Sequence, residues 1–215
     1  MDSNVNAQTE RLSLTGPAGA IEAVRDAPAA GAPVRGVAVI AHPHPLFGGT
    51  MDNKVVQTLA RAFVASGFAA VRFNFRGVGG TAGVHDAGDG ELDDLLAVVR
   101  QVAPEGPVAL AGFSFGAFVT SHAIARLWGE RRVESAVLVG TATSRFTVAP
   151  LPPDAHMRTL VVHGEHDETV PLATVMDWAR PQTLPVTVVP GGGHFFHGQL
   201  PLLKGLVMRH LQFMP

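Results

Sequence analysis

A serine between two glycines stands where a catalytic nucleophile is expected. Ser114 is the centre of Gly112-Phe113-Ser114-Phe115-Gly116, directly after the apolar run 108–113 and before the amphipathic stretch 115–128. A turn this tight between a strand and a helix strains the serine backbone, and only glycine fits two residues before and two residues after it. The hydroxyl is then exposed beside the helix N-terminus, where amide donors and the positive end of the dipole lie. The pattern predicts a nucleophile rather than a helix cap.

A serine hydroxyl needs a general base, and the base needs a group that orients it. His194 follows three glycines, 191–193, which come after the apolar run 185–189. A histidine on such a flexible turn can bring its imidazole to a neighbouring strand end, so we predict that His194 is the base. The alternative, His197, lies farther from the strand end and is expected to point elsewhere.

Three carboxylates compete for the orienting role. Glu165, Asp167 and Glu168 all lie in the segment 163–171, which overlaps the end of an apolar strand. Asp167 stands in the turn before the next helix, where an aspartate also serves as an N-cap or turn residue. The residues alone leave the three open.

The loop 42–49, His-Pro-His-Pro-Leu-Phe-Gly-Gly, is expected to supply an N–H donor to a tetrahedral oxyanion. Two donors are needed, each stabilising the transition state by about 3 kcal/mol, and the first is the N–H of Phe115, the residue after the nucleophile. Because Pro43 and Pro45 have no N–H, the second donor is either His44 or Leu46.

A metal site is the competing interpretation of the same loop. His42 and His44 could gather with His163 and His166. The alternating prolines already explain the loop as a stiff turn, and no H-E-x-x-H pattern is present. We therefore predict no metal and no cofactor.

The elements that must position these residues are short apolar runs that alternate with amphipathic ones. Strands are expected over 12–14, 20–25, 36–41, 69–75, 108–113, 135–140, 159–164 and 185–189, and helices over 51–66, 91–102, 115–128, 172–178 and 202–213. Continuously apolar strands between helices predict a mainly parallel sheet covered on both faces, in a single α/β domain over residues 1–215. Active sites of such sheets lie at the carboxyl ends of the strands, where all the motifs above stand.

Composition narrows the partners. The chain has 16 Lys+Arg against 18 Asp+Glu, which gives no electrostatic reason to expect nucleic acid or an anionic membrane surface. It has no cysteine, which excludes thiolate catalysis, disulfides and cysteine-based metal sites. The polar segment Met1–Glu10 does not read as a secretory signal, and no apolar run reaches the roughly 20 residues that cross a bilayer. We expect a cytoplasmic protein, a monomer or a homodimer.

Together these residues resemble the α/β-hydrolase superfamily, especially small bacterial members without a cap that are related to dienelactone hydrolases. The run 42–56 resembles their oxyanion segment, and Arg72–Gly79 resembles the strand and loop after their first helix. The segment 164–171 matches the family turn G-x-x-D-x-x-V-P, which favours Asp167 as the acid. The order serine, acid, histidine is that of the superfamily. The resemblance covers about residues 10–212.

The resemblance implies a serine hydrolase of the carboxylesterase kind, with an acyl-enzyme formed on Ser114. Thioesterase or peptidase action through the same residues, and a binding protein without turnover, are the alternatives. The segment 141–158 is too short for a cap domain, so we expect an open site for a small or extended ester or acyl substrate. Six aromatic side chains are candidates for an apolar acyl pocket: Phe47, Phe113, Phe115, Phe146, Phe195 and Phe196. Arg72 and Arg76 could bind a substrate carboxylate or pair with acidic residues of the chain, among them Asp86, Asp89, Glu91, Asp93 and Asp94.

Overall fold

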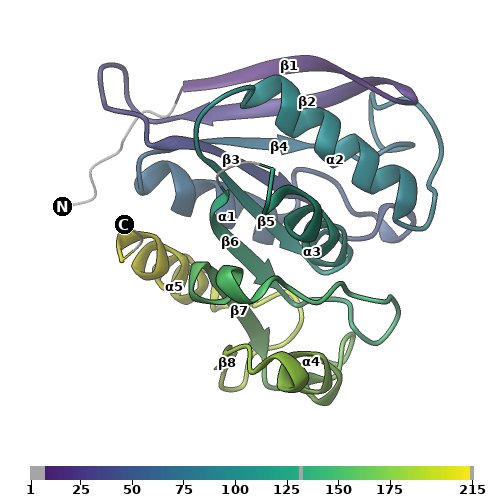
Figure 1. Ribbon diagram of the computed structural model, residues 1–215, viewed down its shortest axis with the longest axis vertical. Helices are drawn as coiled ribbons and strands as arrows, with labels where there is room; N and C mark the ends of the chain where they lie inside the picture. Colours follow the sequence, from purple (N-terminus) through teal and green to yellow (C-terminus); the bar gives the residue numbers. More distant parts are fainter. Residues whose placement is uncertain (1–7, 131–132, 214–215) are drawn as a thin grey trace.

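An eight-stranded sheet forms the centre of the molecule in the computed structural model, which describes residues 8–130 and 133–213. The strand order is β1-β2-β4-β3-β5-β6-β7-β8 (Figure 1). The strands are β1 Gln8–Gly16, β2 Gly19–Ala27, β3 Gly36–Ala41, β4 Phe68–Phe73, β5 Val108–Phe113, β6 Val133–Val139, β7 Thr159–Gly164 and β8 Val186–Val189. The first two strands form a hairpin whose second strand pairs antiparallel with β4, and all the other pairs are parallel. The predicted, mostly parallel sheet is confirmed.

Helices cover both faces of this sheet. They are α1 Lys54–Ala65, α2 Asp89–Val102, α3 Phe115–Leu127, α4 Leu172–Ala179 and α5 Leu200–Gln212, with short 3-10 helices η1 Pro45–Phe47, η2 Pro153–Arg158 and η3 Arg180–Gln182. Helices α2, α3 and α4 pack on one face, and α1 and α5 pack on the other (Figure 1). The connection from β6 to β7 contains only η2, so no cap domain lies over the sheet, as expected.

Side-chain alternation explains why the central strands are apolar throughout. In β5, Val108 and Leu110 contribute to the core under α2 and α3, whereas Ala109, Ala111 and Phe113 contribute to the core under α1 and α5. A strand with a period of two that is covered on both faces needs apolar residues at every position. The same geometry brings the carboxyl ends of β3, β5, β6, β7 and β8 to one edge.

All five helices differ from their predicted bounds by one to three residues at one end or both, and capping explains where α1 and α2 begin. Helix α1 begins at Lys54 rather than at residue 51, because the Asn53 side-chain oxygen accepts the Val55 N–H at 2.9 Å and fixes the start there. Helix α2 begins at Asp89 rather than at residue 91, because a Glu91 carboxylate oxygen accepts the Gly88 N–H at 2.8 Å.

Two expectations concern the ends of the chain and the membrane. The polar segment Met1–Glu10 falls mostly on residues 1–7, which lie outside the described residues. Within residues 8–130 and 133–213, none of the helices combines the length and the apolar character that crossing a bilayer requires.

Candidate active site

Ser114 occupies a strained turn between β5 and α3. Its φ is 57° and its ψ is −114°, and its N–H donates to the Val139 carbonyl at 2.8 Å. A Cβ on Gly112 would collide with the Gly116 backbone, and a Cβ on Gly116 would collide with the carbonyls of Ala41 and His42. The two glycines therefore permit the close approach that the sequence pattern predicts.

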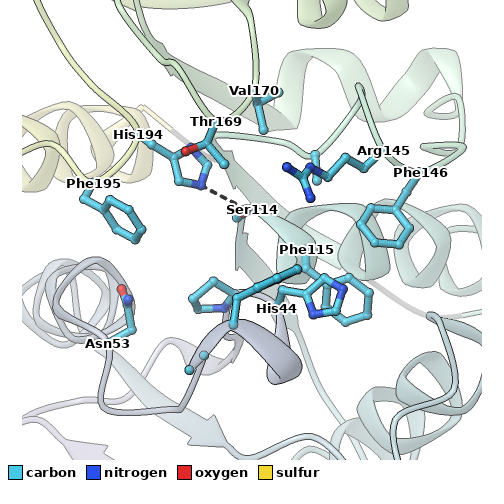
Figure 2. Close-up of a pocket in the computed structure, with 15 residues that line it drawn as sticks. His44, Asn53, Ser114, Phe115, Arg145, Phe146, Thr169, Val170, His194 and Phe195 are labelled. Atoms are coloured by element: carbon cyan, nitrogen blue, oxygen red, sulfur yellow. Dashed lines mark hydrogen bonds between the residues drawn. The ribbon is translucent and has the colours of Figure 1, made fainter.

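His194 hydrogen-bonds to Ser114 although the two residues are 80 positions apart. The distance from His194 Nε2 to Ser114 Oγ is 3.0 Å (Figure 2). On the other side of the ring, His194 Nδ1 lies 2.6 Å from Asp167 Oδ2. A carboxylate only accepts, so Nδ1 carries the proton and Nε2 accepts from the serine hydroxyl. The side chains of all three residues are largely buried, with relative exposures of the residues between 5% and 8%. His197 is exposed and does not contact Ser114.

Asp167 is held in place by backbone donors. Its Oδ1 accepts the N–H groups of Thr169 at 2.9 Å and of Val170 at 2.7 Å, which leaves Oδ2 for His194. Burial alone would raise the pKa of Asp167, but the hydrogen bonds from His194 and Val170 outweigh it and hold the pKa below its usual value. Asp167 is therefore a carboxylate when His194 needs an acceptor.

The two rival glutamates lie elsewhere. Glu165 accepts the Gly191 N–H at 2.8 Å and lies 3.8 Å from His166, on the surface. Glu168 is exposed. Of the three carboxylates that the sequence left open, the one that contacts His194 is Asp167.

His163 lies directly behind this acid. Its fully buried ring donates from Nε2 to the Val170 carbonyl at 2.9 Å, and the same nitrogen is 3.4 Å from Asp167 Oδ2. Burial lowers the pKa of His163, so the ring is neutral. Within the described part of the chain, no group of three or more histidine and carboxylate side chains is placed to hold a metal ion. The four histidines considered for such a site stand at the ends of two different strands, His42 and His44 after β3 and His163 and His166 at the end of β7.

The loop after β3 contains both candidates for the second oxyanion donor, and only one of the two N–H groups is free within the described part of the chain. The Leu46 N–H donates to His44 Nδ1 at 3.2 Å, so it is engaged within the loop. The His44 N–H has no acceptor among the residues that the structure describes. Phe115 is the first residue of α3, so its N–H has no intrahelical acceptor either. The His44 and Phe115 rings lie 4.9 Å apart, and the geometry favours His44 over Leu46 as the second donor.

His42 anchors this loop from beneath and is fully buried. Its Nδ1 donates to the Pro43 carbonyl at 2.6 Å, and its Nε2 accepts the Phe75 N–H at 3.0 Å. Both ring nitrogens are therefore used, and protonation of Nε2 would break the bond from Phe75. Burial, only partly offset by the bond to Pro43, lowers the pKa of His42 to about 4.

We expect His42 to make the protein less stable in mild acid. The folded pKa is about 4 and the unfolded value is 6.5, so between these pH values the unfolded chain binds a proton that the folded chain does not. The free energy of unfolding should fall as pH drops below 6.5, and His42 should account for up to about 3 kcal/mol of that loss at pH 4. Urea unfolding at pH 7.5, 5.5 and 4.5 measures it.

The control for this prediction is the His42→Gln variant, which cannot titrate at this position. It should be less stable than the wild type at pH 7.5, and the difference should shrink towards pH 4.5. A difference that stays constant with pH would contradict the prediction. If the variant does not fold, an NMR titration of the His42 ring in the wild type gives the folded pKa directly.

An open cavity of about 360 Å³ lies over Ser114 and His194 (Figure 2). Four of the six phenylalanines proposed for an acyl pocket line it: Phe47, Phe115, Phe146 and Phe195. The expectation is wrong for Phe113 and Phe196, which are fully buried in the core under α1 and α5. Phe113 instead packs behind the His194 ring, with centroids 4.9 Å apart.

Some cavity residues were missed by sequence reasoning. Asn53, Arg145, Thr169 and Val170 all line the cavity. Three of them follow strand ends, as the triad residues do, so the rule that located Ser114 also applies to the segment after β6 that contains Arg145. That segment contains no recognisable motif, so the sequence gives no reason to single out Arg145 within it.

The two arginines that were candidates for substrate binding are paired within the protein. Arg72 bonds to Asp26 at 3.1 Å and to Asp52 at 3.0 Å. Arg76 makes a two-pronged contact with buried Asp94 at 2.9 and 3.0 Å, with Asp86 at 3.8 Å. The structural alternative is confirmed for both, although the partners of Arg72 are not those proposed.

The chain is similar to a known protein family and to solved structures of α/β serine hydrolases. Residues 32–152 match the family model described as serine aminopeptidase, S33, a range that includes Ser114 and ends before Asp167 and His194. A solved α/β serine hydrolase without a lid, from Xanthomonas campestris, is 36% identical, with 97% of this chain and 96% of that chain covered and a TM-score of 0.86. An α/β serine hydrolase homologue from Coxiella burnetii is 38% identical, with 94% and 97% covered and a TM-score of 0.80.

Part of this chain is also similar in sequence to a protein whose name gives no function. An uncharacterized protein of Rickettsia prowazekii is 39% identical over 120 residues, which is 54% of this chain. The match spans half the length of that relative.

Proposed function

This chain belongs to the α/β-hydrolase superfamily of serine hydrolases, and from that premise we propose that it cleaves carboxylic esters through an acyl-enzyme on Ser114. The observation that carries the proposal is the hydrogen-bonded chain from Ser114 through His194 to Asp167 at the floor of an open, mostly apolar cavity. The roles follow from which atoms donate and which accept.

In the acylation step, Ser114 Oγ attacks the ester carbonyl carbon while its proton passes to His194 Nε2. The carbonyl oxygen becomes an oxyanion, which the N–H groups of Phe115 and His44 stabilise. Collapse of this intermediate breaks the bond to the alcohol oxygen, and the alcohol leaves with the proton from Nε2. The acyl group stays on Ser114 as an ester.

Deacylation repeats these steps with water as the nucleophile. His194 Nε2 takes a proton from water, and the acid leaves as Ser114 recovers its proton. In both halves, Asp167 Oδ2 accepts the Nδ1 proton of His194, which fixes the tautomer and stabilises the imidazolium.

The cavity favours an ester over the amino-terminal peptide that the family description names. A free α-ammonium group needs a negative partner, and the cavity lining, within residues 8–130 and 133–213, contains neither aspartate nor glutamate. The lining is mainly apolar, with aromatic rings on both sides of Ser114 (Figure 2). An uncharged or anionic acyl group therefore suits the site better than a cationic one.

We expect purified protein to hydrolyse 4-nitrophenyl butyrate with a kcat/KM at least about 100-fold above that for alanine 4-nitroanilide, because the activated ester is the more reactive acyl donor and the described cavity lining offers no carboxylate to pair with the ammonium group. Rates on the ester, on butyryl thioester and on the anilide measure this preference. A kcat/KM that is highest for the anilide would overturn the ester assignment, and one that is highest for the thioester would make the protein a thioesterase.

A fluorophosphonate probe separates an enzyme from a binding protein that only keeps the fold. Peptide mapping should find the probe on Ser114, and His194→Ala should abolish labelling because the hydroxyl loses its base. Wild-type protein that neither labels nor turns over any of the three substrates would support the binding alternative.

A further inference from the structure

Among the described residues that line the cavity, Arg145 alone carries a permanent charge. The other titratable residues of this described lining are His44 and His194, and it includes no lysine, aspartate or glutamate. Figure 2 shows its guanidinium pointing towards the space beside Ser114, on the side opposite Phe195 and Asn53. The active-site mouth therefore has one charged side and one uncharged side.

The guanidinium of Arg145 has no anionic partner in the part of the chain that the structure describes. It lies over the exposed Phe47 ring, 5.9 Å from the centroid. Arg72 and Arg76, in contrast, are each satisfied by two carboxylates. Five N–H donors in a planar fork thus face the cavity with no carboxylate to accept from them.

The backbone around Arg145 is fixed, so the side chain starts from a defined position. The N–H groups of Arg145 and Phe146 both donate to the Ala142 carbonyl at 3.2 Å. The Phe146 ring stacks on Phe118 of α3, with centroids 4.7 Å apart and planes 16° apart. Two residues before Arg145, the Thr143 hydroxyl hydrogen-bonds to the hydroxyl of Thr174 in α4 at 2.7 Å.

The positive charge of Arg145 also affects His44, in the loop 42–49. Burial, and after it the neighbouring His85 ring, lowers the pKa of His44, and the charge on Arg145 acts in the same direction although Glu91 opposes it. Arg145 therefore supplies a fixed positive charge at the side of the cavity where His44 lies. Such a charge favours anionic over cationic substrates.

We propose that Arg145 binds a carboxylate of the substrate, so that the preferred substrates are esters that carry a free carboxylate a few atoms from the scissile bond. This inference rests on the proposed ester hydrolysis. The planar fork of arginine matches a carboxylate with two parallel hydrogen bonds, and the apolar rings of Phe47 and Phe146 line the same cavity as Ser114. Remote binding of this kind positions the reacting carbonyl.

The test compares two matched pairs of esters. In the first pair, 4-nitrophenyl hydrogen adipate and 4-nitrophenyl hexanoate differ by a carboxylate on the acyl side. In the second pair, 4-acetoxybenzoate and 4-acetoxybenzamide differ by a carboxylate on the alcohol side. For each pair, the measured quantity is the ratio of kcat/KM for the anionic ester to kcat/KM for the neutral one.

We expect Arg145→Gln to lower this ratio by about 10- to 100-fold in at least one pair, mainly through KM, as for the loss of a charge-assisted hydrogen bond. Arg145→Lys should restore part of the ratio, because it keeps the charge but not the fork. Arg180→Gln is the matched control: Arg180 is exposed, pairs with Asp177 at 2.7 Å and does not line the cavity, so the ratio should not change.

Ratios that Arg145→Gln leaves unchanged in both pairs would overturn the inference, as would an equal loss for anionic and neutral esters. Hydrolysis of the neutral esters that depends on Ser114 would in that case leave the proposed function standing. If the wild type hydrolyses none of the four esters and Ser114 does not label, the proposed function fails, and the inference fails with it.

Discussion

We expect the Ser114→Ala variant to lose ester hydrolysis almost completely, with kcat lower by about 10⁵- to 10⁶-fold. Ser114 Oγ is the atom that would bond to the acyl group, and it is the atom 3.0 Å from His194 Nε2. Alanine leaves the base, the acid and the two N–H donors in place but provides nothing for them to activate. The residual rate should be that of substrate binding and oxyanion stabilisation alone.

The fold should be unaffected, because the side chain removed is small and makes one hydrogen bond. We therefore expect the same urea midpoint within error and a similar KM for 4-nitrophenyl butyrate. His197→Ala is the control, since His197 is exposed and does not line the cavity, and it should keep wild-type kcat. Ser114→Ala activity within about 10-fold of the wild type would exclude Ser114 as the nucleophile, since loss of a triad nucleophile costs far more.

The contact between His194 and Ser114 could be predicted from the sequence only in part. The position of each residue after an apolar strand could be predicted, because strand ends of a parallel sheet share one edge. The distance could not, since β8 lies three places from β5 in the sheet. The imidazole must cross the end of β6, where Gly140 has φ of 55° and a Cβ would lie 3.2 Å from His194 Cε1. The sequence shows Gly140 only as a glycine after an apolar strand, which does not predict that the His194 ring packs against it.

The sequence could not decide between His44 and Leu46 as the second oxyanion donor, for a different reason. Proline removes an N–H by its covalent structure, so Pro43 and Pro45 could be eliminated from the residue type alone. Which remaining N–H is free depends on the turn, and here His44 Nδ1 accepts a hydrogen bond from the Leu46 N–H. Arg72 and Arg145 illustrate the same limit, because two arginines near strand ends differ only in whether a distant carboxylate reaches them.

The acid gives the second large effect, and we expect Asp167→Asn to lower kcat by about 10⁴-fold. Oδ1 accepts two backbone N–H groups, from Thr169 and Val170, so the asparagine oxygen should take this position. Its NH₂ group then faces His194 Nδ1, which must become the acceptor. The ring proton moves to Nε2, and that nitrogen can no longer take the proton of Ser114. Activity is therefore lost because His194 adopts the wrong tautomer, although the positions of the three side chains do not change.

Glu165→Gln and Glu168→Gln are the matched controls for this variant. Each removes one negative charge from the same turn, but neither carboxylate contacts His194, so kcat should stay within about 3-fold of the wild type, as for a weak surface charge effect. If all three variants lost activity equally, the effect would be the field of the acidic turn rather than the hydrogen bond. A loss confined to Asp167→Asn, with ¹⁵N NMR showing the His194 proton on Nε2, would assign the orienting role to the single oxygen that lies 2.6 Å from Nδ1.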